Sequence, residues 1–335
     1  MIASRARGLG MVELMVSLVL GLLVVGAASM IFLGTRQASR ATDNLSRIQE
    51  SQRTTYDLMV RELREAGGTP CDAGLSVANV LKNAQGATPT WWASNAEPMR
   101  GFDAGDAFDG AAIGAGVGQR VAGTDAVLVR FGADLAGLGV IAHDTGATKL
   151  TVNRATHGLR DGDLLLVCNY RQASLFQTNS AHDGSADIFH VANTGSPGNC
   201  DAGLGVPVLC NGTGTAYNYA PGAINPGGRL GRWIAAGWYI GNNGRPDTGG
   251  RSLYRVTRTG AEEVAEGVRD MQLAYLVSGA LDYVAAGAVA DWSRITAVRV
   301  DMTFEAPQSG ATTSASAPRL TRSVGYTATL RNMQP

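Results

Sequence analysis

A single carboxylate, Glu13, lies at the start of an otherwise uncharged apolar run. The twenty residues from Leu14 to Leu33 carry no charged side chain, and about twenty apolar residues cross the hydrocarbon core of a bilayer as a helix. A carboxylate inside that core costs about 2.5–3.5 kcal/mol at a helix centre and less near the interface. Glu13 therefore predicts a partner for its carboxylate. The alternative is that its carboxylate lies at the level of the lipid headgroups.

The four cysteines are Cys71, Cys168, Cys200 and Cys210. No CxxC pair occurs, so their spacing does not match a zinc site. An even number of cysteines behind a membrane-targeting N-terminus favours disulfides outside the cytoplasm. We favour Cys200 with Cys210, because that bond closes a short loop, and this leaves Cys71 with Cys168. Four buried free thiols are the alternative.

The sequence contains no catalytic motif of the GxSxG, HExxH or P-loop type. Residues 182–190 (HDGSADIFH) bring two histidines and two aspartates together, but their spacing fits no metal site and a polar loop is the simpler interpretation. Aspartates at 103–110 and 161–163 offer oxygen ligands for calcium without the spacing of an EF-hand. We therefore expect no enzymatic activity, no cofactor, no small-molecule substrate and no resident metal.

The apolar run continues into an amphipathic helix. No proline precedes Pro70, and Gly67 and Gly68 provide a stop signal. Oppositely charged residues lie four apart at Asp57 and Arg61, and at Arg61 and Glu65, as on an exposed helix face. A mostly apolar stripe recurs at spacings of three and four. Its members are Leu45, Ile48, Gln52, Tyr56, Met59, Leu63 and Ala66.

The charges before the apolar run predict its orientation. Arg5 and Arg7 should hold the N-terminus in the cytoplasm, with everything after Gly34 outside. A cleaved secretory signal is the alternative, because residues 26–29 (GAAS) resemble a signal-peptidase site. The run is longer than a typical signal core, and the helix pattern continues past it, so we favour an anchor.

Beyond Gly68 the pattern changes to short strands. Period-two alternation predicts half-buried antiparallel strands, and short apolar runs bounded by Gly and Asp predict others. The predicted strands are 125–131, 161–170, 270–277, 294–306 and 319–332. Residues 307–317 are expected to form a hairpin loop. Residues 72–123 and 178–250 lack periodicity and are expected to form long loops, whose aromatic residues either contact another subunit or pack on the domain's own sheet.

The N-terminus resembles the class III signal of type IV prepilins. That signal is a short basic leader ending in Gly, followed by an apolar helix with Glu as its fifth residue. Here Gly8 would end the leader, Leu9 would become the N-terminus, and Glu13 is the fifth residue from there. Leu9 stands where Phe is usual, and Gly10 is uncommon in the second position.

More of the chain resembles the PilW-type minor pilins, which are related to the bulky J-type pseudopilins. The matching segments are 57–68, 161–177 and 266–277. The resemblance implies an α+β, pilin-like fold, a long N-terminal helix followed by an antiparallel β-sheet domain with long loops. The expected parts are a leader (1–8), a transmembrane segment (9–34), an amphipathic extension (35–68) and a periplasmic domain (69–335).

The resemblance also implies a function in type IV pilus assembly. A prepilin peptidase would cut after Gly8 and methylate the amino group of Leu9, and Glu13 of a neighbouring subunit would neutralise that group. The expected location is the inner membrane, and then a fibre or its tip. The implied partners are the prepilin peptidase, the major pilin and other minor pilins, which form a priming complex.

Two other classes of function remain open from the sequence. A bulky pseudopilin of type II secretion would share the N-terminus and the helix. A membrane-tethered periplasmic enzyme or binding protein would tolerate changes at Gly8 and Glu13. Nucleic acid is not expected as the main partner, because the net charge is zero, with 28 basic and 28 acidic residues.

Overall fold

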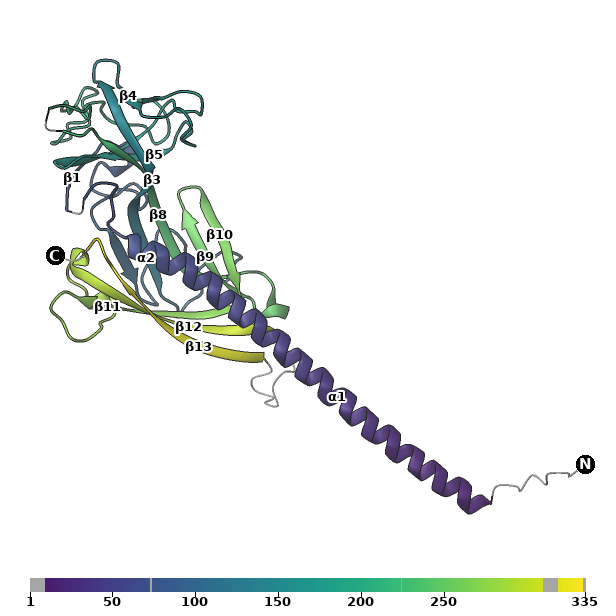
Figure 1. Ribbon diagram of the computed structural model, residues 1–335. Helices are drawn as coiled ribbons and strands as arrows, with labels where there is room; N and C mark the ends of the chain where they lie inside the picture. The colour runs from purple at the N-terminus through teal and green to yellow at the C-terminus, as the bar shows by residue number, and fades with distance from the viewer. Residues whose placement is uncertain (1–9, 73, 224, 310–318, 334–335) are drawn as a thin grey trace, which may run out of the picture.

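One long N-terminal helix projects from a β-rich head (Figure 1). Helix α1 (Met11–Thr55) continues through one π-helical turn, η1 (Tyr56–Val60), into α2 (Arg61–Glu65). Two sheets follow, so the fold is α+β as predicted. The computed structural model describes residues 10–72, 74–223, 225–309 and 319–333.

The helix ends where the glycine pair predicts. Gly67 has a φ of +73°, a left-handed conformation that glycine adopts without a steric penalty. The Gly68 N–H donates to the Glu65 carbonyl at 2.8 Å, and the Gly67 N–H donates to the Arg130 carbonyl at 2.9 Å. The last turn is therefore closed locally and tied to a strand of the head.

The predicted stripe is confirmed over most of its length. Ile48, Met59 and Leu63 are buried against the head. Leu45 is an exception, with 39% of its surface exposed, and its neighbour Asn44 is buried instead. The Asn44 amide donates to the Gln308 carbonyl at 3.1 Å, which turns Asn44 toward the head and Leu45 away from it.

The π-helical turn changes the charge pairing on the helix. A π turn accommodates one extra residue, so side chains four apart across it no longer lie above one another. The expected ion pair of Arg61 with Asp57 is accordingly not formed among the described residues. The expected pair of Arg61 with Glu65, both within α2, is not formed there either. Asp57 instead lies 3.7 Å from the Arg53 guanidinium, on the α-helical side of the turn.

The large sheet contains ten strands in the described part of the chain. Its main path is β1-β6-β5-β8-β3-β4-β7, with β2 beside β3 and the β9–β10 hairpin beside β8. All pairs are antiparallel except β1 with β6, so the sheet is mixed rather than antiparallel throughout. Its strands are β1 (Ser76–Asn79), β2 (Met99–Phe102), β3 (Ala126–Asp144), β4 (Lys149–Val152), β5 (Leu164–Cys168), β6 (Gln172–Gln177), β7 (Asp187–Phe189), β8 (Arg229–Asn242), β9 (Arg251–Thr257) and β10 (Gly260–Glu266).

The small sheet is antiparallel, in the order β11-β12-β13. Its strands are β11 (Val268–Val277), β12 (Ile295–Ser309) and β13 (Arg319–Thr329), which confirms three predicted strands. The predicted hairpin loop at 307–317 lies mostly outside the described residues. Short 3₁₀ turns connect the strands, namely η2 (Lys82–Ala84), η3 (Pro246–Thr248), η4 (Ala286–Ala288) and η5 (Trp292–Arg294).

The prediction of loops is wrong for the short strands β1 and β2 in residues 72–123 and β7 in residues 178–250, and it is wrong above all for β8. This strand crosses the middle of the large sheet and pairs with β3, β5 and β9. Consecutive side chains such as Trp238, Tyr239 and Ile240 are all buried, because both faces of the strand are covered. A strand buried on both faces shows no period-two alternation, which is why the sequence pattern did not reveal it.

The main core lies between the helix, the small sheet and the large sheet. Ile48, Met59 and Leu63 of the helix pack with Val300 and Phe304 of β12. A separate core fills the distal half of the head, around β4, β5, β6 and β7. Figure 1 shows this distal half beyond the end of the helix, so the helix itself contacts only the proximal half.

A buried ion pair fixes the helix to the large sheet. Glu62 accepts a hydrogen bond from Arg255 Nη2 at 2.8 Å and one from Trp238 Nε1 at 2.8 Å. Burial by itself lowers the pKa of Arg255, but Glu62 and Glu262 outweigh burial and raise it. Glu62 falls on the buried face beside Leu63, where a carboxylate is costly unless it is paired.

We expect Glu62→Gln to lower the free energy of unfolding by about 2–3 kcal/mol, because it leaves the Arg255 guanidinium partly buried without its main counter-charge. Glu262→Gln is the matched control. It contacts the same arginine from an exposed position, so it should cost less than about 1 kcal/mol. Urea unfolding of the two variants in detergent measures the difference, and equal midpoints would contradict this role of Glu62.

Candidate functional site

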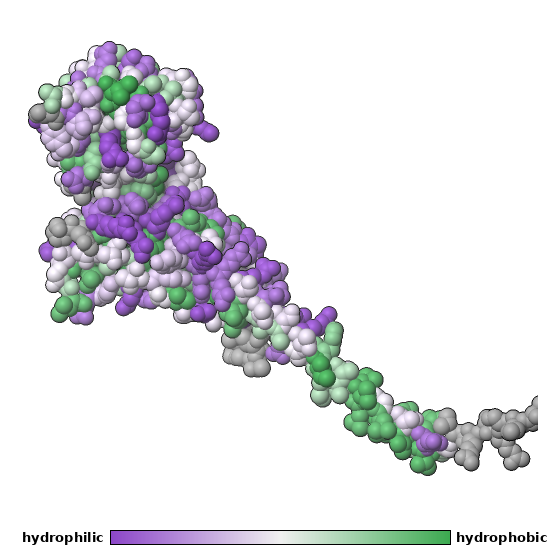
Figure 2. Space-filling view, in the orientation of Figure 1, coloured by the Kyte–Doolittle hydropathy of each residue, from purple (hydrophilic) through white to green (hydrophobic). Residues whose placement is uncertain are grey.

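The N-terminal half of α1 is uncovered by the rest of the described chain. Its apolar side chains from Met11 to Leu33 are exposed, and its most apolar window has a mean hydropathy of 2.6 with no part buried. Figure 2 shows this projecting segment as a green hydrophobic rod, whereas the helix beside the head carries purple polar residues. The segment is long and apolar enough to cross a membrane.

Glu13 lies in the first turn of this exposed segment. The helix begins after Gly10, whose carbonyl accepts the Glu13 N–H at 3.0 Å. The Glu13 side chain is exposed and makes no ion pair within the described residues. The other predicted residues of the N-terminal signal, Arg5, Arg7, Gly8 and Leu9, lie outside the described residues.

The same helix connects the apolar segment to the head without a break. Ser51 Oγ donates to the Glu266 carbonyl at 3.1 Å, and Asn44 makes its bond to β12 one to two turns earlier. The apolar segment and the packed segment therefore form one rod.

The two disulfides have the pairing that the sequence favours. Cys71 is bonded to Cys168, and Cys200 is bonded to Cys210. The first joins the segment just after the helix to the end of β5, across 97 residues of chain. Closing loops of this kind stabilises the folded chain by about 4.7 kcal/mol for the long loop and about 2.7 kcal/mol for the short one in the chain-entropy account. Such bonds indicate an extracytoplasmic head.

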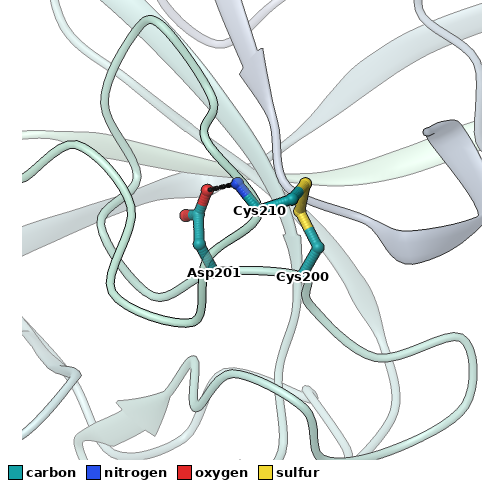
Figure 3. Close-up of side chains that lie close together, drawn as sticks. All are labelled: Cys200, Asp201 and Cys210. Atoms are coloured by element: carbon teal, nitrogen blue, oxygen red, sulfur yellow. Dashed lines mark hydrogen bonds between the residues drawn. A yellow bond between two sulfur atoms is a disulfide. The ribbon is translucent and has the colours of Figure 1, made fainter. Parts of the chain in front are cut away.

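Cys200, Asp201 and Cys210 form the one group of potential metal ligands that lies within 4.8 Å in the described part of the chain. Figure 3 shows that the two sulfur atoms are bonded to each other, so neither can act as a thiolate ligand. The Asp201 carboxylate accepts the N–H groups of Gly203 at 3.1 Å and of Cys210 at 3.3 Å. Asp201 therefore closes a loop, and the cluster does not fit a metal ion.

The aspartate-rich segments also form loop contacts. Asp103 accepts the N–H groups of Ala286 at 2.9 Å and Gly287 at 2.8 Å, and so joins the segment to η4. Asp161 accepts the Ala181 N–H, and Asp163 pairs with Arg232 at 3.1 Å. These carboxylates satisfy backbone donors rather than converge on a common point, which removes the geometric basis for a calcium site there.

The histidines of residues 182–190 are separated in the fold. His182 is exposed, whereas His190 is fully buried and contacts His143 of β3, with 3.2 Å between their Nε2 atoms. The Tyr219 N–H donates to His143 Nδ1, so the proton of His143 is on Nε2 and points at His190. Burial lowers the pKa of His143 to about 4. Burial, with a smaller effect of His143, lowers the pKa of His190 to about 3.

Some functional and structural contacts gave little signal in the sequence. The Glu62–Arg255 pair joins residues 193 apart, and only the position of Glu62 on the buried helix face indicates it. The histidine pair joins residues 47 apart, with no motif around either one.

Comparisons of the chain with protein families, with curated proteins and with solved structures find no match. A long apolar N-terminal helix followed by a β-sheet domain is nevertheless a pilin-like architecture. The two disulfides are consistent with a head outside the cytoplasm.

We expect the histidine pair to make the head less stable in mild acid. Unfolded histidines bind protons below a pKa of about 6.5, whereas the folded pair does so only near pH 4 and below, so stability falls as the pH drops from about 6.5 toward 4. The expected loss between pH 6.5 and 5 is on the order of 2–3 kcal/mol.

Urea unfolding at a series of pH values measures this loss. His190→Gln removes one titrating group and should lower the slope of stability against pH. His182→Gln changes an exposed histidine and should leave the slope unchanged. A slope that is the same in all three proteins would rule out the buried pair as its source.

Proposed function

We propose that this chain is a minor pilin of the PilW type that acts in assembly of a type IV pilus. The observation that carries the proposal is the single helix that is apolar and uncovered at one end, packed on a β-rich head at the other, and marked by Glu13 in its first turn. The prepilin-like residues just before that turn support the same function. The role is structural, in assembly, rather than catalytic.

Processing would create the partner that Glu13 needs. Cleavage after Gly8 places an ammonium group on Leu9, which is then methylated. In a low-dielectric environment the attraction between that group and the Glu13 carboxylate of a neighbouring subunit is much stronger than in water. Each charge then offsets the desolvation of the other. Cleavage also removes Arg5 and Arg7, which oppose movement of the N-terminus into the bilayer.

The size and position of the head favour a place at the fibre tip. The head contains a ten-stranded sheet and a three-stranded sheet at the far end of the rod, and a bulky head is easier to accommodate at a tip than in every repeat of a fibre. The proposed partners are other minor pilins and the major pilin, after insertion in the inner membrane. A bulky pseudopilin of type II secretion would use the same helix, so surface pili are the measurement that distinguishes the two functions.

Gly8→Val should block maturation, because a branched side chain replaces the residue at the cut. The expected result is a full-length chain that keeps its leader, an unmethylated N-terminus and loss of surface pili. Mass spectrometry of the N-terminus and counting of pili measure these effects. Gly10→Ala is the matched control, since a Cβ there meets no atom within 4 Å. Normal maturation and normal piliation in Gly8→Val would show that the chain is not a prepilin.

Glu13→Gln should leave membrane insertion intact and reduce incorporation into pili at least about tenfold, the factor that corresponds to about 1.4 kcal/mol of lost attraction. Ser17→Ala, one turn further along the same exposed helix, should incorporate normally. Quantitative immunoblots of the membrane and pilus fractions measure the ratio. Equal incorporation of the two variants would exclude the ion pair with Glu13 as the assembly contact.

A further inference from the structure

Strand β13 forms an open edge of the small sheet. It pairs with β12 on one side, and no other strand of the described chain pairs with its outer side. The Leu330 N–H donates to the Thr296 carbonyl at 2.9 Å, and Thr329 lies opposite Ala297, so Leu330 belongs to a hydrogen-bonded pair. Because such pairs alternate along an antiparallel ladder, the backbone N–H and C=O groups of the even-numbered residues of β13 point toward β12. The outward-facing backbone groups belong to Thr321, Ser323, Gly325, Thr327 and Thr329.

The part of this edge from Ser323 to Thr329 lacks the features that usually prevent strand addition, whereas Arg319 and Arg322 lie at the start of the strand. Protected edges carry charges, proline or a bulge. The seven residues from Ser323 to Thr329 include no charged residue and no proline, and the pairing with β12 shows no irregularity between Thr321 and Thr329. Edges of this kind accept an extended segment of another chain through main-chain hydrogen bonds.

A basic groove runs beside the C-terminal end of the same strand. It has a volume of about 280 Å³, and its lining includes Tyr56, Val60, Arg61, Arg64 and Arg331. Among the described residues, the side chains of the three arginines make no ion pair and no hydrogen bond.

The groove has a positive excess because its own carboxylates do not neutralise it. Asp57 and Glu65 also line it, but Asp57 pairs with Arg53 on the other side of the π-helical turn. The π-helical turn moves Arg61 out of line with Asp57, and in the described part of the chain Glu65 makes no ion pair with any of the three arginines. The guanidinium donors therefore stay available to a carboxylate from another molecule.

The groove and the strand edge form one surface. The ring of Tyr56 in the groove lies 5.1 Å from the ring of Tyr326 in β13, and Arg331 follows the strand by two residues. Asn332 donates to the Glu65 carbonyl, which holds the end of the strand against the end of the helix. A strand added to β13 would thus have its end beside the three arginines.

We propose that β13 accepts an extended, acidic segment of a partner protein as an additional strand. Its main chain would bond to the outward groups of Ser323, Gly325 and Thr327, and its carboxylates would pair with Arg61, Arg64 and Arg331. Cleavage after Gly8 and the charge of Glu13 are not required for this contact, so it is separate from the proposed function.

A second copy of this chain does not fit the surface. β13 begins beside Ser309, near the helix at Asn44, and ends near Glu65, so it runs in the same direction as the helix. Antiparallel pairing of two copies would point their apolar helices in opposite directions, which one membrane cannot accommodate. Parallel pairing would place the same residues of the two copies opposite each other. The arginine cluster of one copy would then face the arginine cluster of the other.

The full-length chain in detergent, mixed with a capped peptide of alternating valine and glutamate, tests the proposal. A length of about nine residues matches a long strand. In the free chain the amides of Ser323, Gly325 and Thr327 should exchange with solvent rapidly, and those of Val324 and Tyr326 slowly. The peptide should slow the first group at least about tenfold. Residue-resolved hydrogen exchange measures both states.

Variants separate the two parts of the surface. Thr327→Pro removes an outward N–H without breaking a bond to β12 and should abolish the protection, whereas Thr327→Val keeps that N–H and should retain it. The double variant Arg61→Glu and Arg64→Glu should also abolish it, with Arg40→Glu on the exposed helix as the control for charge.

Four results would overturn the proposal. They are no slowing by the acidic peptide, equal slowing by a peptide with lysine in place of glutamate, binding that leaves the outward amides unprotected, and amides already protected because the chain pairs with itself. Sedimentation of the free chain distinguishes the last case.

Discussion

The contact between the second half of the helix and the small sheet is the interaction on which the rest of the structure depends. Ile48, Met59 and Leu63 bury one face of the helix against β12, and Glu62 adds a charged contact to the large sheet. Burying apolar side chains of this size stabilises by about 1.5–3 kcal/mol each. Without that contact the helix and the head would be joined only by the covalent chain. The apolar half of the helix would then have no fixed direction relative to the head.

The helix joins two environments with opposite demands. The described chain does not cover its apolar half, so those side chains need an apolar environment supplied from outside the chain. The second half of the helix packs against the core of the head. The π-helical turn lies in the packed half, where it moves Arg61 out of line with Asp57, and Asp57 pairs with Arg53 instead. A local change of helix geometry therefore produces a surface charge excess.

The distal half of the head is held together by different means. Its loops lack long regular stretches, so side chains accept backbone N–H groups that a ladder would otherwise pair, and a disulfide closes one of the loops. Asp201 closes one loop at the Cys200–Cys210 bond, and Asp161 accepts the Ala181 N–H from a segment twenty residues away. The buried pair of His143 and His190 belongs to this half as well. Polar residues that resemble ligands in the sequence are thus mostly structural.

The sequence by itself determined the features that depend on local spacing. The apolar run, the end of the helix at Gly67 and the alternating strands of the small sheet follow from periods of three to four or of two, and the length of the loop between Cys200 and Cys210 favoured the correct disulfides. Only the tertiary structure determined that residues 229–242 form strand β8. Both faces of this strand are buried, so its sequence does not alternate between apolar and polar residues. The tertiary structure also decided the Glu62–Arg255 pair and the open edge of β13. Which strand pairs with which, and which charge meets which, depends on segments far apart in the chain, and no local pattern records that choice.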